Sequence, residues 1–211
     1  MFARPWIIGL QPLALLFGLH FAFGVSLALA NDDRIHSLVD PIEVPAAKHH
    51  ALEQYVTARE AARYLAIYRE TLMVDVRVPS DVAASGIAVP VVRNVPLYID
   101  VPRSGGGQTT TETTVNPRLV GDIRSIVMQR GGWRLRPHLA TIFLICTSGT
   151  HAAIAADELQ RSGFARVYTI VDGFDGDVGP DGRRTINGWR QAGLPWTPQP
   201  RPSQRAKMTA K

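Results

Sequence analysis

The sequence predicts an α/β domain in which helices cover both faces of a central parallel sheet. Between residues 58 and 171, a helical pattern followed by a short apolar strand occurs three times. Each predicted strand is a continuous apolar run, which is typical of parallel strands buried on both faces. Of the 211 residues, 45% are hydrophobic and 19% are charged. This composition indicates a globular protein and excludes a disordered, collagenous or multi-span membrane chain.

The first helix–strand unit begins with Thr57 and Glu60, which have the spacing of a capping box. The apolar residues that follow recur at helical intervals, so a helix is predicted over residues 58–68. The apolar run at residues 71–76 then predicts the first strand. A helix that leads directly into a buried strand is the repeating element of an α/β sheet.

The second and third units repeat this order. Pro117 is typical of the first turn of a helix, and the predicted helix ends before Gly131, ahead of an apolar strand at residues 140–145. A third helix is predicted over residues 151–161, and a third strand over residues 167–171. Because helices and strands alternate, the strands are expected to run parallel.

Two stretches interrupt the pattern, and a basic tail follows it. Residues 103–114 are rich in Gly and Thr and predict a flexible surface insertion. Residues 174–187 are rich in Gly and Asp and predict a long loop, whose aspartates are expected to form turns rather than a metal site. The tail at residues 198–211 combines prolines with basic residues and predicts a disordered segment. The net charge of +5 is mild, and no basic run is interleaved with stacking aromatics, which excludes nucleic acid as a partner.

The first 30 residues predict a secretory signal segment. Arg4 is their only charged side chain, a long apolar stretch follows it, and Ala28 and Ala30 match a small-x-small cleavage site. The alternative is an uncleaved membrane anchor, since residues 13–30 are just long enough to span a bilayer. Either form exports the remaining chain, so a periplasmic location is expected, with membrane contact only if the segment stays attached. The expected divisions are a signal segment at 1–30, an extended lead-in at 31–53, one domain at 54–197 and the tail at 198–211.

Cys146 is the only cysteine and lies directly after the predicted strand at residues 140–145. In an open parallel sheet, ligands bind at the carboxyl ends of the strands. A short glycine-containing loop at the start of the next helix directs backbone N–H groups and the helix dipole toward that point. These donors favour the thiolate, which is the nucleophilic form of cysteine. The alternative is that Cys146 is a buried apolar residue without reactivity.

Five short motifs occur in order between Tyr55 and Trp196, with Cys146 in the fourth. They are Tyr55-Val56-Thr57 with Glu60-Ala61-Ala62, Val74-Asp75-Val76-Arg77 before Pro79, Asn94-Val95-Pro96-Leu97, the loop Cys146-Thr147-Ser148-Gly149-Thr150-His151, and Val171-Asp172-Gly173 with the ending Gly188-Trp189, Ala192-Gly193-Leu194-Pro195. In order and spacing, these motifs resemble those of rhodanese-like domains, the sulfurtransferases that carry sulfur as a cysteine persulfide.

This resemblance implies that Cys146 accepts sulfane sulfur from a small anionic donor such as thiosulfate and passes it to a thiophilic acceptor or a periplasmic protein partner. It implies no metal and no organic cofactor. Asp75 and Arg77 are expected to form an ion pair that braces the loop. The related phosphatases have an arginine where Ala152 stands, so phosphate-ester chemistry is not expected. The substrate-binding loop is expected to consist of Thr147, Ser148, Gly149, Thr150 and His151, and His151 either contacts substrate or faces solvent at the start of the helix.

Two other functions remain open from the sequence. One is a persulfide relay that serves a specific periplasmic redox protein and uses free thiosulfate poorly. The other is a non-catalytic interaction module that uses the fold as a scaffold. The reactivity of the Cys146 thiol distinguishes the two sulfur functions from the module.

Overall fold

The computed structural model of the chain describes residues 35–105, 108–131 and 137–207. The predicted signal segment at residues 1–30 and the last four residues of the tail lie outside these ranges. In the described part of the chain, no helix combines the length and the apolar character that a membrane span needs.

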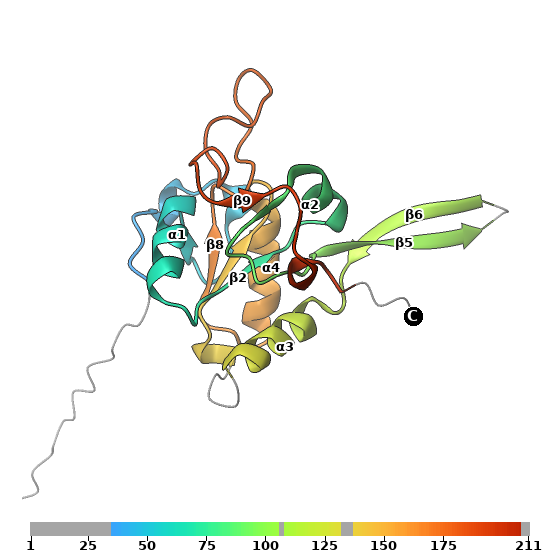
Figure 1. Cartoon of the computed structure of the whole chain (residues 1–211), viewed down its shortest axis with the longest axis horizontal. Helices are drawn as coiled ribbons and strands as arrows, with labels where there is room; N and C mark the ends of the chain where they lie inside the picture. The colour runs from blue at the N-terminus through green and yellow to red at the C-terminus, as the bar shows by residue number, and fades with distance from the viewer. Residues whose placement is uncertain (1–34, 106–107, 132–136, 208–211) are drawn as a thin grey trace, which may run out of the picture. The chain divides into compact units, whose positions relative to one another are not determined.

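A five-stranded parallel sheet forms the centre of the domain, as the sequence predicts (Figure 1). The strand order is β1-β8-β7-β2-β4, with β7 in the middle. Leu72 pairs with Ile142, and the four residues of β2 match the four of β7 in register. The strands are β1 (Tyr55–Val56), β2 (Leu72–Asp75), β4 (Arg93–Asn94), β7 (Ile142–Ile145) and β8 (Val167–Ile170).

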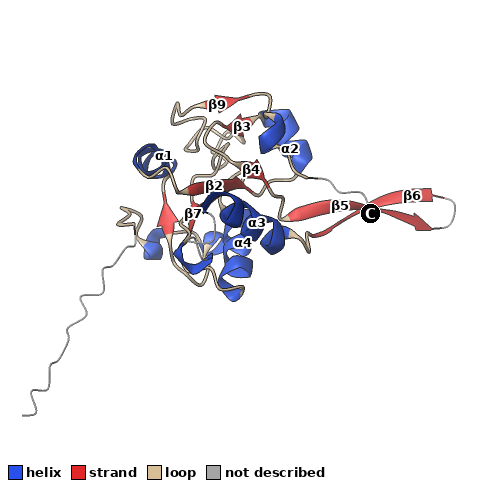
Figure 2. Cartoon of the chain, turned by 60° about the horizontal axis from the view of Figure 1, so that its bottom comes forward, coloured by secondary structure: helices blue, strands red, loops and turns tan. Residues whose placement is uncertain are grey.

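Helices cover both faces of this sheet (Figure 2). Along β7, Ile142 and Leu144 belong to the apolar cluster that includes α3 (Leu119–Gly131) and α4 (Thr150–Arg161). Phe143 belongs to the cluster on the other face, with α1 (Ala58–Ile67) and α2 (Pro79–Ser85). Successive strand residues point to opposite faces, so a continuous apolar run fills both layers. The predicted α/β class is therefore confirmed.

The predicted helices and strands occur within two residues of their expected ends. The capping box is present: the Thr57 hydroxyl accepts from the Glu60 amide, and the Glu60 carboxylate accepts from the Thr57 amide. This arrangement satisfies two backbone donors that the first turn of α1 would otherwise leave unpaired.

The segment at residues 103–114 differs from the expected flexible insertion. It belongs to an antiparallel hairpin of β5 (Tyr98–Gly105) and β6 (Gln108–Val115) that projects from the body of the domain (Figure 1). The β-branched threonines of β6 fit an extended pairing, although they give little apolar signal. Low hydrophobicity therefore marks a strand pair with little apolar surface to bury, rather than a flexible loop.

The tail also differs from the expected disordered segment. Just before the tail, Trp196–Thr197 form β9, which pairs with β3 (Ile87–Ala88). Within the tail, a 3₁₀ turn forms, η5 (Pro202–Gln204). The Gln204 side chain is 1% exposed, and its amide nitrogen donates to the carbonyl of Val91 at 2.9 Å. The prolines restrict the backbone, and one buried amide then holds the segment on the domain.

The lead-in is not simply extended. It contains two 3₁₀ turns, η1 (Pro41–Glu43) and η2 (Ala46–Lys48). Lys48 is buried, and its Nζ donates to the Val171 carbonyl at 2.9 Å and pairs with Asp177 at 2.8 Å. The lead-in is thus joined to the long loop at residues 174–187.

Candidate active site

Cys146 follows β7 at the carboxyl edge of the sheet, beside the centre of the domain. Its side chain is 2% exposed and belongs to the apolar cluster beneath α3 and α4. The chain then turns through Thr147, Ser148 and Gly149 into α4. The structure therefore places the sulfur where a parallel sheet ends and a helix begins, as the sequence predicts.

Backbone amides of this turn face the sulfur. The Gly149 N–H donates to the Cys146 Sγ at 3.1 Å. Gly149 is the residue before α4 and has a left-handed backbone with φ of 103°. A Cβ at this position would lie 2.7 Å from the Val171 carbonyl oxygen, so only glycine fits the turn. The backbone amides of Ala152, Ser148 and His151 also act to lower the pKa of the Cys146 thiol.

The electrostatics of Cys146 differ from the expectation of a favoured thiolate. Burial raises the pKa of the Cys146 thiol above its ordinary value, and the four amides lower it by less than burial raises it. Removing a thiolate from water penalises the charged form more than these donors favour it. At neutral pH the resting group is therefore a neutral thiol, with donors already aimed at its sulfur.

Asp75 and Arg77 form a buried ion pair with both side chains 0% exposed. The Arg77 Nη2 lies 2.6 Å from the Asp75 Oδ2, and Nη2 also donates to the Gly86 carbonyl at 2.8 Å. Burial acts to lower the pKa of Arg77, but the carboxylates of Asp75, Asp175 and Asp81 together outweigh it and raise that pKa above its ordinary value. Removing one partner of such a pair leaves an uncompensated buried charge, which typically costs about 3–5 kcal/mol.

The ion pair is connected to the cysteine loop through Phe174 and Asp175. The Arg77 guanidinium lies 4.2 Å from the centroid of the Phe174 ring. The Phe174 amide donates to the Cys146 carbonyl at 2.7 Å, and the Asp175 amide donates to the Thr147 carbonyl at 3.0 Å. These contacts bring together the predicted brace and the predicted loop, although the two motifs are far apart in the sequence.

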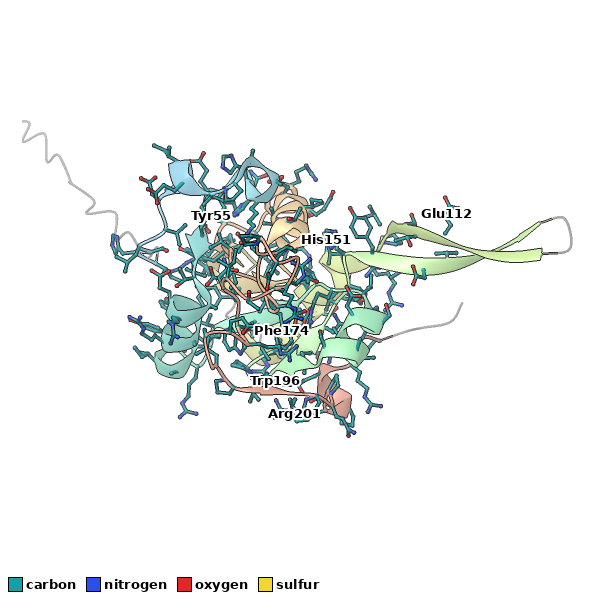
Figure 3. All side chains as sticks on the ribbon, turned by 90° about the horizontal axis from the view of Figure 1, so that it is seen from above. Tyr55, Glu112, His151, Phe174, Trp196 and Arg201 are labelled. Carbon is teal, nitrogen blue, oxygen red and sulfur yellow. The ribbon has the colours of Figure 1, made fainter. Side chains whose placement is uncertain are left out.

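His151 is exposed at the first turn of α4, and its ring contacts Tyr98 edge-to-face with centroids 5.2 Å apart. Tyr98 is the first residue of β5, so the base of the hairpin lies beside the loop. Seen from above in Figure 3, His151 lies on the side of the body that faces the hairpin, while Phe174 lies nearer Trp196. Thr147, Ser148 and Thr150 are half-buried, so part of each of these residues reaches solvent.

Lys48 is a neighbour of the site that sequence reasoning missed. Its Cδ would lie 3.0 Å from a Cβ built on Gly149, so the lysine stem runs along the cysteine loop. No periodicity or motif in the lead-in indicates this contact, because it depends on the path of residues 35–54 across the domain. In residues 35–105, 108–131 and 137–207, no group of three His, Cys, Asp or Glu side chains is placed to hold a metal ion.

Fold and site together define an α/β protein with a buried cysteine in an amide-lined turn at the carboxyl edge of a parallel sheet. No known protein-family model matches the chain. Uncharacterized protein RC0915 of Rickettsia conorii is 39% identical over 57 residues, 27% of this chain and 42% of that protein. Uncharacterized protein RP600 of Rickettsia prowazekii is 38% identical over 55 residues, 26% of this chain and 40% of that protein. The chain thus spans about two fifths of the length of these curated relatives.

Among solved structures, Rv0390 from M. tuberculosis shares the fold. It aligns with a TM-score of 0.51 and 24% identity, over 72% of this chain and 100% of that one. The polysulfide-sulfur transferase homodimer from Wolinella succinogenes aligns with a TM-score of 0.40 and 20% identity, over 74% of this chain and 85% of that one. The TM-score of 0.40 for the Wolinella protein is too low to support an argument. The likeness to Rv0390, at 24% identity, shows the fold alone.

Proposed function

We propose that the chain is a rhodanese-type sulfurtransferase that carries sulfane sulfur as a persulfide on Cys146. The observation that carries this proposal is the Gly149 N–H directed at the Cys146 Sγ from 3.1 Å, within a turn whose amides converge on the sulfur. Five motifs in the order of rhodanese-like domains support it independently. A turn of this kind suits an anion held at the end of the cysteine side chain.

The reaction begins when the Cys146 thiol loses its proton to solvent and the thiolate attacks the sulfane sulfur of thiosulfate. A sulfur–sulfur bond forms to Cys146, the sulfur–sulfur bond of thiosulfate breaks, and sulfite leaves with the bonding electron pair. The persulfide anion then lies against the amides of the turn, which stabilise its charge. A thiophilic acceptor such as cyanide takes the outer sulfur and restores the Cys146 thiolate.

The loop residues have separate roles in this proposal. The amides of Ser148, Gly149, His151 and Ala152 hold the negative charge, and the half-buried Thr147 and Thr150 hydroxyls offer donors to the oxygens of an anionic donor. His151, exposed beside Tyr98, lies at the entrance on the hairpin side. Asp75 and Arg77 act as positioning residues, because they reach the loop through Phe174 and Asp175.

We also propose that residues 1–30 export the chain to the periplasm. The charged residue near the start, the apolar stretch and the small-x-small end support this step. N-terminal sequencing of the protein recovered from the periplasmic fraction is expected to begin at Asn31. A chain that starts at Met1 and sediments with membranes indicates the anchored form instead.

Sulfur transfer from thiosulfate to cyanide tests the proposed activity. The purified chain is expected to turn over and to gain the mass of one sulfur atom after incubation with thiosulfate. Cys146→Ser is expected to lose both signals, whereas Ser125→Ala, at an exposed serine of α3 outside the site, is expected to keep both. Turnover that survives in Cys146→Ser refutes Cys146 as the carrier.

The burial of Cys146 supports two other candidate functions. One is a partner-specific persulfide relay, and the other is a non-catalytic binding module. The thiol is 2% exposed and its pKa is raised, so free small donors meet a poor nucleophile. If the native thiol reacts with an alkylating reagent but yields neither turnover nor a sulfur adduct, a protein partner supplies the sulfur. If it reacts only after denaturation, the fold serves as a binding module.

A further inference from the structure

A second candidate site lies at the opposite edge of the sheet from Cys146. A cavity of about 440 Å³ opens where the strands begin, next to Thr71, which precedes β2. In a parallel sheet all amino-terminal ends lie at one edge, and Cys146 follows β7 at the other. The cavity is therefore separate from the turn proposed to carry sulfur, and its function does not depend on that proposal.

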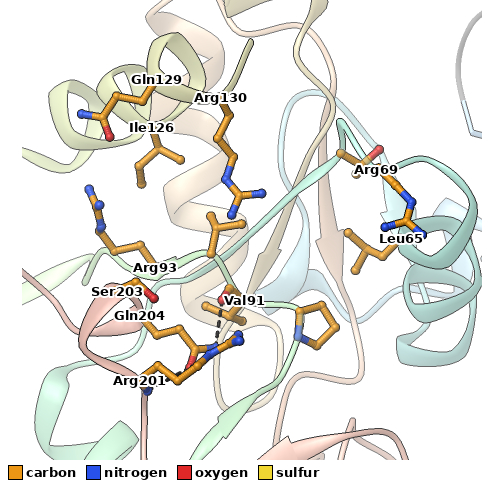
Figure 4. A pocket seen from close by; sticks show the side chains of 13 residues that line it. Leu65, Arg69, Val91, Arg93, Ile126, Gln129, Arg130, Arg201, Ser203 and Gln204 are labelled. Atoms are coloured by element: carbon orange, nitrogen blue, oxygen red, sulfur yellow. Dashed lines mark hydrogen bonds between the residues drawn. The ribbon is translucent and has the colours of Figure 1, made fainter.

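Four arginines from four parts of the chain line this cavity (Figure 4). Arg69 follows α1, Arg93 begins β4, Arg130 lies in the last turn of α3, and Arg201 precedes η5. Figure 4 shows Arg69 on one side, Arg93 and Arg130 on the other, and Arg201 below. The arginines thus surround the opening rather than forming a row along one helix.

These positive charges are not neutralised by the cavity itself. None of its thirteen lining residues is an aspartate or a glutamate. Within the described residues, the side chains of Arg69, Arg93 and Arg130 make no hydrogen bond and no ion pair. Arg201 donates to the Val89 carbonyl at 3.0 Å and to Gln204 at 3.1 Å, which positions its guanidinium without balancing its charge. The cavity therefore brings four formal positive charges together in a chain whose net charge is +5.

We propose that the cavity binds a small molecule that carries two linked phosphate groups. Guanidinium groups match phosphate oxygens with paired donors, and two phosphates carry about −3 to −4 near pH 7, which balances four arginines. A single phosphate or a dicarboxylate leaves about half of that charge unpaired. The volume falls in the usual range for small-ligand sites, and Leu65, Val91 and Ile126 add an apolar wall for the organic part of the molecule.

Isothermal titration of the purified full chain with pyrophosphate tests this proposal, with inorganic phosphate as the comparison. Pyrophosphate is expected to bind at least about tenfold more tightly than phosphate, since it meets more than one guanidinium. Arg93→Gln and Arg130→Gln are each expected to weaken pyrophosphate binding by about fivefold or more. Arg59→Gln, which removes an exposed charge of α1 outside the cavity, is expected to leave the affinity unchanged. Thermal unfolding of each variant checks folding. If Arg93→Gln is unstable, Arg130→Gln alone tests the proposal, because Arg130 is exposed.

Three results would overturn the proposal. The first is no saturable binding of pyrophosphate by the wild-type chain in moderate salt. The second is an equal loss of affinity in Arg59→Gln, which would indicate diffuse attraction to a basic surface. The third is binding to vesicles of equal parts phosphatidylglycerol and phosphatidylcholine without binding to free pyrophosphate, which would assign the arginines to a lipid surface.

Discussion

Burial and the backbone amides of the turn have opposite effects on a negative charge at Cys146. The neutral thiol gains from its apolar surroundings, while the anion depends on the amides of Ser148, Gly149 and His151. Attack requires the thiolate, which burial disfavours. The environment therefore favours the neutral thiol, and deprotonation becomes the demanding step.

The alkylation rate of Cys146 by iodoacetamide is expected to keep rising with pH beyond the ordinary thiol pKa of about 8.5, because the folded pKa is raised. The same shift affects the free energy of unfolding. The stabilising contribution of the neutral Cys146 thiol is complete below the thiol pKa of the unfolded chain, and it is lost as pH rises through the raised pKa of the folded chain. Rates measured from pH 6 to pH 10 check the prediction, with Cys146→Ser as the blank. A rate that levels off below about pH 7 contradicts it.

In the β5–β6 hairpin, none of the residues whose burial is described, 98–101 and 112–115, is fully buried. Asp100 and Val101 are exposed in β5, and the residues from Glu112 to Val115 are exposed in β6. At the base of the hairpin, Tyr98 meets His151, and the Asn116 amide donates to the Leu97 carbonyl. The two strands pair along their whole length, and the hairpin projects from the body of the domain (Figure 1).

Replacing residues 101–112 with Asn-Gly is therefore expected to leave thermal stability nearly unchanged. Asp100 and Thr113 are directly opposite in the ladder, so a two-residue turn can join them. The expected change in Tm is within about 2 °C, less than a loss of 1 kcal/mol would produce. Differential scanning calorimetry checks this outcome, and thiosulfate turnover should persist because Tyr98 is retained. A fall in Tm of about 6 °C or more would show that the hairpin packs on the domain.

At the scale of the whole described domain, two segments outside the predicted limits of 54–197 hold distant parts together. Lys48 of the lead-in bridges Val171 and Asp177. Gln204 of the tail fixes the turn that follows β3, with donors to Val91 and Val89. Both residues lie in short 3₁₀ turns, outside the central sheet and the α-helices that cover it, yet both are buried.

Gln204→Ala is expected to lower the free energy of unfolding by about 1–3 kcal/mol, because it leaves the buried Val91 carbonyl without its donor. Gln199→Ala, an exposed glutamine of the same segment, is expected to change it by less than about 0.5 kcal/mol. Urea denaturation of both variants gives the comparison. Equal effects of the two changes would mean that the tail does not stabilise the domain.

The sequence predicts those parts of the molecule that follow from local pattern. Continuous apolar runs identify β2, β7 and β8, the Thr57–Glu60 pair identifies the start of α1, and the motif around Cys146 identifies the turn. The hairpin was missed because strands with little apolar surface to bury lack a hydrophobic period. Lys48, Gln204 and the four arginines could not be found, since each acts through partners distant in the sequence.

The lengths of the strands also determine where the molecule could associate with itself. The outer strands of the central sheet, β1 and β4, have two residues each, so they offer few free backbone groups to a strand of another molecule. In the described part of the chain, β5 and β6 have eight residues each and pair only with each other. Intermolecular strand addition, and with it aggregation at high concentration, is therefore favoured at the hairpin and disfavoured at the sheet.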